Sequence, residues 1–255
     1  MTAYKLLGGI DMSLEVILSI LEKNWPMFLR GAGITLAIAI ISTIIGALIG
    51  FFIGIMHTIP VRKKSAKSVI LKIFNAILTI YVEVFRGTPM IVQAMVIFYG
   101  LASYGLELDR FVAALVIVGL NTGAYMAEIV RGGIVSIDKG QFEAAQAIGM
   151  NHFQVMIYVV IPQVARNILP ATGNQLVMNI KDSAVLNVIS VTELYYQTKS
   201  VAGANFKFAE SFFIACVIYL VMTITATRLL RIMERKLDGP DAYKVAKTPK
   251  PENNM

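Results

Sequence analysis

Three polar side chains are spaced to lie on one face of a helix within an apolar stretch of this chain. Asn121, Tyr125 and Glu128 follow one another at i, i+4 and i+7, which places them on the same helical face. Polar groups are costly in a membrane-spanning helix and often mark the path of a solute. We expect this face to contact a substrate or a gate. For Glu128 the alternative is a structural ion pair with Arg131 at i, i+3.

A second polar face lies farther along the chain. Gln175, Asn179 and Ser183 are four residues apart, and Asp182 precedes the last of them. We expect this face also to line a substrate pathway. The alternative is that these amides and hydroxyls join neighbouring helices by hydrogen bonds.

The sequence Arg-Gly-Thr-Pro predicts a helix break inside a long apolar segment. Glycine and proline together interrupt a helix unless neighbouring groups satisfy the freed backbone. We expect the break at Gly87, Thr88 and Pro89, with a structural or gating role. Glu83 and Arg86 are i, i+3 neighbours and are predicted to pair beside it.

The composition indicates the class of protein that contains these groups. Hydrophobic residues make up 56% of the 255 residues and charged residues 15%, whereas a soluble domain carries about 25% charged residues. The apolar residues gather into runs long enough to cross a bilayer. One all-α polytopic membrane bundle is therefore expected, without a large soluble module.

The net charge of +7 has a membrane explanation. Basic residues gather at 62–67 and 228–250, next to apolar runs, as in cytoplasmic loops of membrane proteins. No nucleic-acid partner is expected. No cluster of Cys, His and Asp has metal-ligand spacing, so no metal site is predicted.

Five membrane crossings are predicted from the apolar runs. The second run is longer than one crossing requires and contains the break, so it forms one broken crossing or two. Gly46, Gly50 and Gly54 lie four residues apart in the first run and predict close approach of another helix. The predicted crossings are residues 31–56, 69–104, 110–130, 169–191 and 209–230.

The distribution of charge favours a single broken crossing, because two crossings would place the basic loop and the basic tail on opposite sides. The amino terminus is then outside and the carboxyl terminus cytoplasmic. Residues 1–24 are predicted as an amphipathic interfacial segment, residues 25–235 as the membrane domain, and residues 236–255 as a polar cytoplasmic tail.

The longest water-facing link, residues 139–162, is cytoplasmic in this topology. Residues 141–148 can form two helical turns, and Gly149 suits a C-terminal stop. Asn151 can cap the next helix, and Pro162 is expected to close the segment. The alanines of the link suit a short helix that packs closely against another protein.

The same link carries the motif of a known family. A Glu-Ala-Ala triplet, a glycine and a downstream proline have the spacing found in permease subunits of bacterial ATP-binding-cassette (ABC) importers, which this chain resembles. Residues 82–93, 121–134 and 179–194 also resemble segments of the polar amino-acid uptake subgroup. The motif residues are Glu143, Ala144, Ala145, Gly149, Val159, Ile161 and Pro162, with Val159 and Ile161 in place of the usual Ile and Leu.

The resemblance implies a transport subunit that is not itself an enzyme. In this family the cytoplasmic link forms a coupling helix, here residues 140–150, that docks in a cytoplasmic dimer of ABC ATPases. The sequence contains no G-x-x-x-x-G-K-[ST] phosphate loop, the motif that binds nucleotide phosphates. ATP and Mg²⁺ are therefore expected on the partner ATPase, and no cofactor on this chain.

The resemblance also implies the other partners and the place of action. These are an amino-acid substrate, an extracytoplasmic amino-acid-binding protein, membrane lipids and the bacterial cytoplasmic membrane. Five crossings are too few to enclose a pathway, so a second permease subunit, identical or homologous, is expected. The alternative is a stand-alone secondary transporter or channel for small polar solutes.

Overall fold

The structure is a computed structural model that describes residues 13–59 and 66–238, and all regular elements in these ranges are helical. The predicted basic loop at 62–64, the first twelve residues and the tail from 239 lie outside the described residues. The α-helices are α1 (Leu14–Met56), α2 (Ala66–Gly87), α3 (Met90–Ser103), α4 (Arg110–Val135), α5 (Lys139–Ala147), α6 (His152–Val155), α7 (Ile161–Asp182), α8 (Leu194–Asn205) and α9 (Phe208–Asp238).

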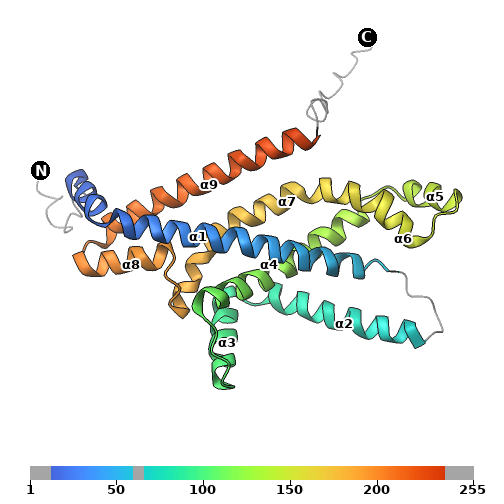
Figure 1. Cartoon of the computed structure of the whole chain (residues 1–255), viewed down its shortest axis with the longest axis horizontal. Coiled ribbons are helices and arrows are strands. Elements are labelled where there is room, and N and C mark those ends of the chain that lie inside the picture. The colour runs from blue at the N-terminus through green and yellow to red at the C-terminus, as the bar shows by residue number, and fades with distance from the viewer. Residues whose placement is uncertain (1–12, 60–65, 239–255) are drawn as a thin grey trace, which may run out of the picture.

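Five of these helical segments are long and apolar enough to cross a membrane, as the sequence predicts. They are residues 14–56, 68–87, 110–135, 152–189 and 208–236. The predicted second segment forms one crossing, α2, followed by the shorter α3, which runs across the direction of α2 (Figure 1). Figure 1 also shows α5 and α6 at one end of the long axis and α8 at the other.

The first helix includes part of the predicted interfacial segment. Ser13 caps α1 by accepting a hydrogen bond from the backbone N–H of Val16 at 3.2 Å. The helix then continues through Pro26 without interruption. Its first turns lie at an angle to the rest (Figure 1), as expected near a proline that removes one helical hydrogen bond. That these turns lie on the membrane surface stays a prediction.

The closest packing in the molecule joins α1 to α4. A Cβ added at Gly50 would lie 2.6 Å from the backbone nitrogen of Ala127, and one added at Gly46 would lie 2.9 Å from that of Gly123. Both distances are too short for a real side chain. The glycine spacing thus predicted the close approach correctly, because helices in a membrane associate through small residues that let backbones meet.

The fourth crossing begins earlier than predicted. Helix runs from His152 through a π-helical turn at Met156–Val160 and into α7, so the expected start near residue 169 is wrong. Pro162 does not close the segment but lies in the first turn of α7. The π-helical turn shifts the hydrogen-bond register, and Ile161 N–H donates to Met156 O. Helices accommodate a missing proline donor at such positions.

A short helix that the sequence did not predict, α8, is fixed by a buried carboxylate. Glu193 is fully buried and accepts hydrogen bonds from the backbone N–H groups of Tyr195 and Tyr196 at 2.9 and 2.8 Å. The Tyr219 hydroxyl of α9 donates to the same carboxylate at 3.0 Å. Burial raises the pKa of Glu193, and these hydrogen bonds partly oppose the rise. One side chain thereby caps α8 and joins it to α9.

Candidate functional site

A cavity of about 350 Å³ lies where the break between α2 and α3 meets α4 and α7. Asn121 and Tyr125 of α4 and Gln175 of α7 all line it, as the two polar faces predict. Thr88 and Pro89 of the break and Asp182 of α7 also line it. The structure therefore brings together three of the six predicted pathway residues and adds a carboxylate beside them.

The break is held open by Gln93, a residue that the sequence analysis did not single out. Pro89 has no N–H, so the carbonyl of Phe85 loses its helical donor. The Gln93 side-chain amide donates to the carbonyl oxygens of Phe85 and Thr88, both at 2.9 Å. Gln93 is 7% exposed. An amide four residues after a proline in an apolar helix was the available signal.

Asn121 ties this arrangement to α4. Its amide nitrogen donates to Gln93 Oε1 at 3.0 Å and to the Phe85 carbonyl at 3.3 Å. Both N–H groups are thus used, and its Oδ1 accepts no hydrogen bond from the described residues. Gln175 donates to Asn179 at 3.5 Å, so its oxygen is available too. With the Asp182 carboxylate, the cavity wall presents mainly hydrogen-bond acceptors.

Asn179 and Ser183 lie outside the cavity, in the packed interior. The Asn179 amide donates to the hydroxyl oxygens of Thr43 at 2.9 Å and Thr122 at 3.0 Å, which joins α7 to α1 and α4. The Ser183 hydroxyl donates to the Ile180 carbonyl of its own helix at 3.0 Å. Asn179 is 2% exposed and Ser183 fully buried. The contacts of Asn179 match the alternative of hydrogen bonds between helices, whereas Ser183 bonds within its own helical segment.

Glu128 lies beside the cavity rather than in it. Arg131 donates to both carboxylate oxygens, at 3.1 and 2.9 Å, as the i, i+3 spacing predicts. Arg86 lies 3.8 Å from the same carboxylate, with its guanidinium 5.7 Å from the centre of the Tyr125 ring. The predicted Glu83–Arg86 pair is wrong, because Arg86 pairs with Glu128 of α4 and the exposed Glu83 forms no ion pair with the described residues.

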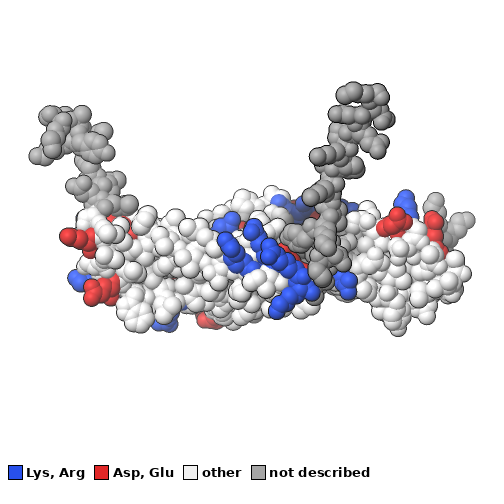
Figure 2. Space-filling model, turned by 90° about the horizontal axis from the view of Figure 1, so that it is seen from above, with Lys and Arg blue, Asp and Glu red and all other residues white. Residues whose placement is uncertain are grey.

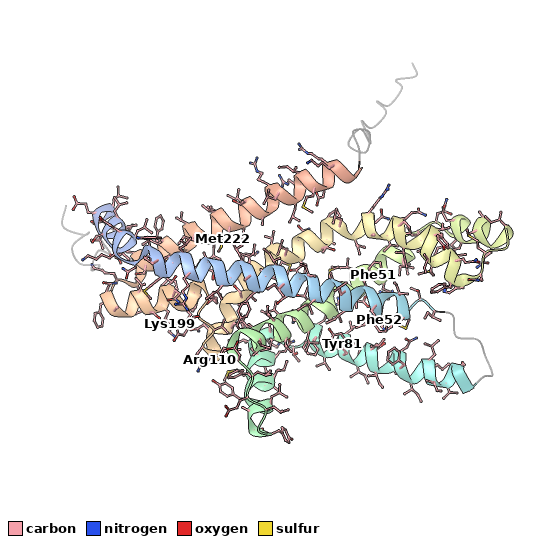
Figure 3. All side chains as sticks on the ribbon, viewed as in Figure 1. Phe51, Phe52, Tyr81, Arg110, Lys199 and Met222 are labelled. Atoms are coloured by element: carbon pink, nitrogen blue, oxygen red, sulfur yellow. The ribbon has the colours of Figure 1, made fainter. Side chains whose placement is uncertain are left out.

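Tyr81 provides a further link between α2 and α4. Its hydroxyl donates to the Leu120 carbonyl at 2.6 Å, and Figure 3 shows Tyr81 on α2 near the ribbon of α4. Together with Arg86 and Asn121, it gives three separate polar contacts between these helices. The end of α2 next to the break is therefore attached to α4 by these polar contacts, in addition to the apolar packing of Val82 against Ala127.

The link between α4 and α7 folds as predicted up to residue 155. Asp138 caps α5 through a hydrogen bond from Gly140 N–H at 2.6 Å. Gly149 has a φ of +88°, a conformation that favours glycine at the end of a helix. Asn151 then forms a capping box with Gln154. The chain turns sharply between α5 and α6 through these local interactions.

The motif residues of α5 divide between two faces. Ala145 is 5% exposed and packs in a cluster with Val155 and Met156. Glu143 and Ala144 are exposed, as are Ile148, which is 77% exposed, and Phe153, which is 72% exposed. One face thus attaches the helix to its own chain, and the other carries acidic and apolar groups outward.

Comparison with known proteins accounts for this combination of features. A family model for binding-protein-dependent transport system inner membrane components matches residues 65–239, a range that includes the cavity and α5. The chain belongs to this family. With its five apolar helices, this inner membrane component is a multi-pass membrane protein.

Relatives of this inner membrane component cover most of its length. The arginine transport system permease protein ArtQ of Bacillus subtilis is 36% identical over 217 residues, or 85% of this chain and 94% of the relative. The glutamine transport system permease protein GlnP of Escherichia coli K12 is 36% identical over 214 residues, or 83% and 93%.

Solved structures show the same architecture. A chain from a crystal structure of an amino acid ABC transporter with histidines has a TM-score of 0.76 and 37% identity, with 86% of this chain and 98% of that chain covered. A chain of the MetNI methionine ABC transporter in an inward-facing conformation has a TM-score of 0.63 at 19% identity, covering 81% and 95%, which supports the shared fold.

Proposed function

We propose that this chain is the permease subunit of an ABC importer for polar amino acids. The relatives named for arginine and glutamine transport support an amino-acid substrate. The observation that carries the proposal is the position of α4. This helix lines the polar cavity and ends four residues before α5, the exposed helix of the cytoplasmic link.

The cavity suits the amino group of an amino acid. Asp182 supplies a carboxylate, and Asn121 and Gln175 supply amide oxygens that accept no hydrogen bond from the described residues, while their amide nitrogens donate to protein groups. An ammonium group has three donors and no acceptor, so it complements such a wall. Tyr125 and Thr88 add hydroxyl groups at the rim. These five residues form the proposed substrate contact.

The cluster of Arg86, Glu128 and Arg131 is proposed to hold the break against α4 while the pathway is closed. The break at Gly87, Thr88 and Pro89 allows the end of α2 to move relative to α3. In that movement the Arg86 guanidinium leaves the Glu128 carboxylate and is hydrated by water instead. Asn179 and Ser183, in this proposal, support the pathway from behind by fixing α7. Tilting of α4 would change both groups of contacts at once.

Coupling is proposed to occur through residues 140–150. Glu143, Ala144, Gly149 and the exposed apolar side chains of the link contact a dimer of ABC ATPases, which binds ATP and Mg²⁺. An extracytoplasmic amino-acid-binding protein delivers the substrate, and a second permease subunit, identical or homologous, completes the pathway. The proposed orientation in the cytoplasmic membrane places the amino terminus outside and the carboxyl terminus in the cytoplasm.

A charge reversal on α5 tests the coupling proposal. In the reconstituted complex with ATPase and loaded binding protein, Glu143→Lys is expected to lower ATP-driven uptake by about tenfold or more, since a lost buried interface contact costs 1–3 kcal/mol. Glu22→Lys, an equal charge change at an exposed position of α1, is the control. Equal uptake by the two variants at equal complex yield would overturn the proposed role of α5.

A further inference from the structure

A second cavity, of about 360 Å³, lies between α7 and α9. Lys181 of α7 and Arg228 and Arg231 of α9 contribute its three charged groups, and Thr223 and Thr227 also line it. Lys181 and Asp182 are adjacent in sequence, yet they line different cavities. Successive helical residues point about 100° apart, so α7 separates a basic site from the proposed substrate site.

The three cations of this cavity, Lys181, Arg228 and Arg231, form no close ion pair with the carboxylates of residues 13–59 and 66–238, although the charge of Lys181 acts on the adjacent Asp182. The hydroxyl of Thr223 donates to the Tyr219 carbonyl at 2.9 Å, and that of Thr227 to the Thr223 carbonyl at 2.7 Å. The free hydrogen-bond donors that remain at the cavity therefore belong to the three charged side chains.

The packing of α7 and α9 maintains this opening. Close contact occurs at Gly173, where an added Cβ would lie 3.0 Å from Leu230. Leu220, Ile224 and Leu229 of α9 are 56%, 48% and 58% exposed, so an apolar surface borders the basic cavity. Figure 2 shows Lys and Arg side chains gathered over the carboxyl-terminal half of α9.

We propose that this cavity binds a phosphate-bearing anion, with its phosphate oxygens between Lys181, Arg228 and Arg231. Arginine and lysine bind phosphate by charge-assisted hydrogen bonds, and basic pockets between membrane helices bind lipid head groups. An anionic phospholipid satisfies both halves of the site, since its acyl chains would cover the exposed aliphatic side chains of α9. A free phosphate group would use the basic half alone.

Lipid binding to the delipidated full-length chain in non-ionic detergent tests this site. Native mass spectrometry would count retained phosphatidylglycerol, with phosphatidylcholine of the same acyl chains for comparison, and a separate titration would use inorganic phosphate. Each of Lys181→Gln and Arg228→Gln is expected to weaken phosphatidylglycerol binding about fivefold, the effect of one basic residue near an anionic head group. Arg228→Lys should restore most of it.

Arg166→Gln is the matched control, because Arg166 is an exposed cation of α7 that does not line this cavity. If the cavity variants bind less phosphatidylglycerol and the Arg166 variant does not, the result supports a lipid head-group site. Loss of inorganic phosphate binding in those variants, without a preference for phosphatidylglycerol, supports the anion site with a soluble ligand. If the cavity variants bind both ligands as the Arg166 variant does, the proposal is wrong.

Discussion

The face of α4 that meets α1 is closed to even one added carbon atom, whereas another face lines a cavity of about 350 Å³ together with α7, α3 and the break before α3. Gly46 and Gly50 of α1 touch α4 directly on the first face. On the second face, Asn121 and Tyr125 meet other helices through hydrogen bonds and a cation–π contact. A single helix thus combines a rigid attachment with a surface that can rearrange.

Neighbouring residues of α4 illustrate the difference. Thr122 is fully buried and hydrogen-bonds Asn179, while Asn121 lines the cavity. Both side chains can form hydrogen bonds, and they differ by about 100° in direction. A polar residue in a membrane helix therefore acquires its role from the helix that it faces.

The largest effect is expected from a methyl group added to the closed face. Gly50→Ala should lower the free energy of unfolding by about 1–3 kcal/mol, because overpacking forces the two helices apart. Gly33→Ala is the control, since a Cβ at Gly33 has no neighbour within 4 Å. Thermal unfolding in detergent measures both. Equal unfolding temperatures for the two variants would show that α1 and α4 can move apart to accommodate the added methyl group.

The next prediction separates the interior amide from the cavity amide. Asn179→Ala should lower the free energy of unfolding by about 1 kcal/mol, as for other interhelical hydrogen bonds in membranes. Asn121→Ala should instead reduce uptake by the assembled complex about tenfold, the effect of one lost polar contact with substrate. Unfolding and uptake are measured on both variants. A reversed pattern would place the substrate on the other side of α4.

A smaller effect is expected at the cluster beside the cavity. Glu128 is partly exposed, so Glu128→Gln should change the free energy of unfolding by less than about 1 kcal/mol, through lost pairing with Arg131 and Arg86. Glu83→Gln, on the exposed face of α2, should have no effect. A double-mutant cycle with Arg86→Gln should give a coupling energy for Glu128 and none for Glu83. Coupling to Glu83 would contradict the observed pairing.

The smallest effect concerns His57 at the end of α1. Burial lowers the pKa of His57, Glu128 opposes this effect and Arg131 adds to it, and His57 Nε2 has no hydrogen-bond partner among the described residues. A lowered pKa in the folded state means that stability is complete above the unfolded value of about 6.5 and falls as the pH drops below it. His57→Gln should reduce that fall between pH 7 and 5. An unchanged pH profile would exclude His57 as its source.

Elements defined by local pattern were predicted well. Apolar run length identified five crossings, glycine spacing identified the closed face of α1, and the signals at Gly149 and Asn151 located the ends of α5 and α6. Each of these features depends on residues within a few turns of one another. These signals are local in sequence, although the closed face itself forms only where α4 packs against α1.

Features that depend on contacts between helices or on departures from regular helical hydrogen bonding were missed or misassigned. The π-helical turn before Pro162 joins α6 to α7 where a stop was expected, and Glu193 fixes α8 through Tyr219 of α9. Arg86 faced two acidic candidates, and only the packing of α2 on α4 selected Glu128 over Glu83. Pro89 leaves the carbonyl of Phe85 without its helical donor, and Gln93, eight residues after Phe85, donates to that carbonyl instead.

The sequence by itself determined the class of protein, the number of crossings, and the residues available for polar contacts, because these follow from apolar run length and residue type. Only the tertiary structure decided that Asn121, Tyr125 and Gln175 share a cavity while Asn179 and Ser183 lie in the interior. The reason is geometric. Helical periodicity specifies which residues share a face, but the packing of neighbouring helices decides whether that face meets a cavity or a close-packed interior.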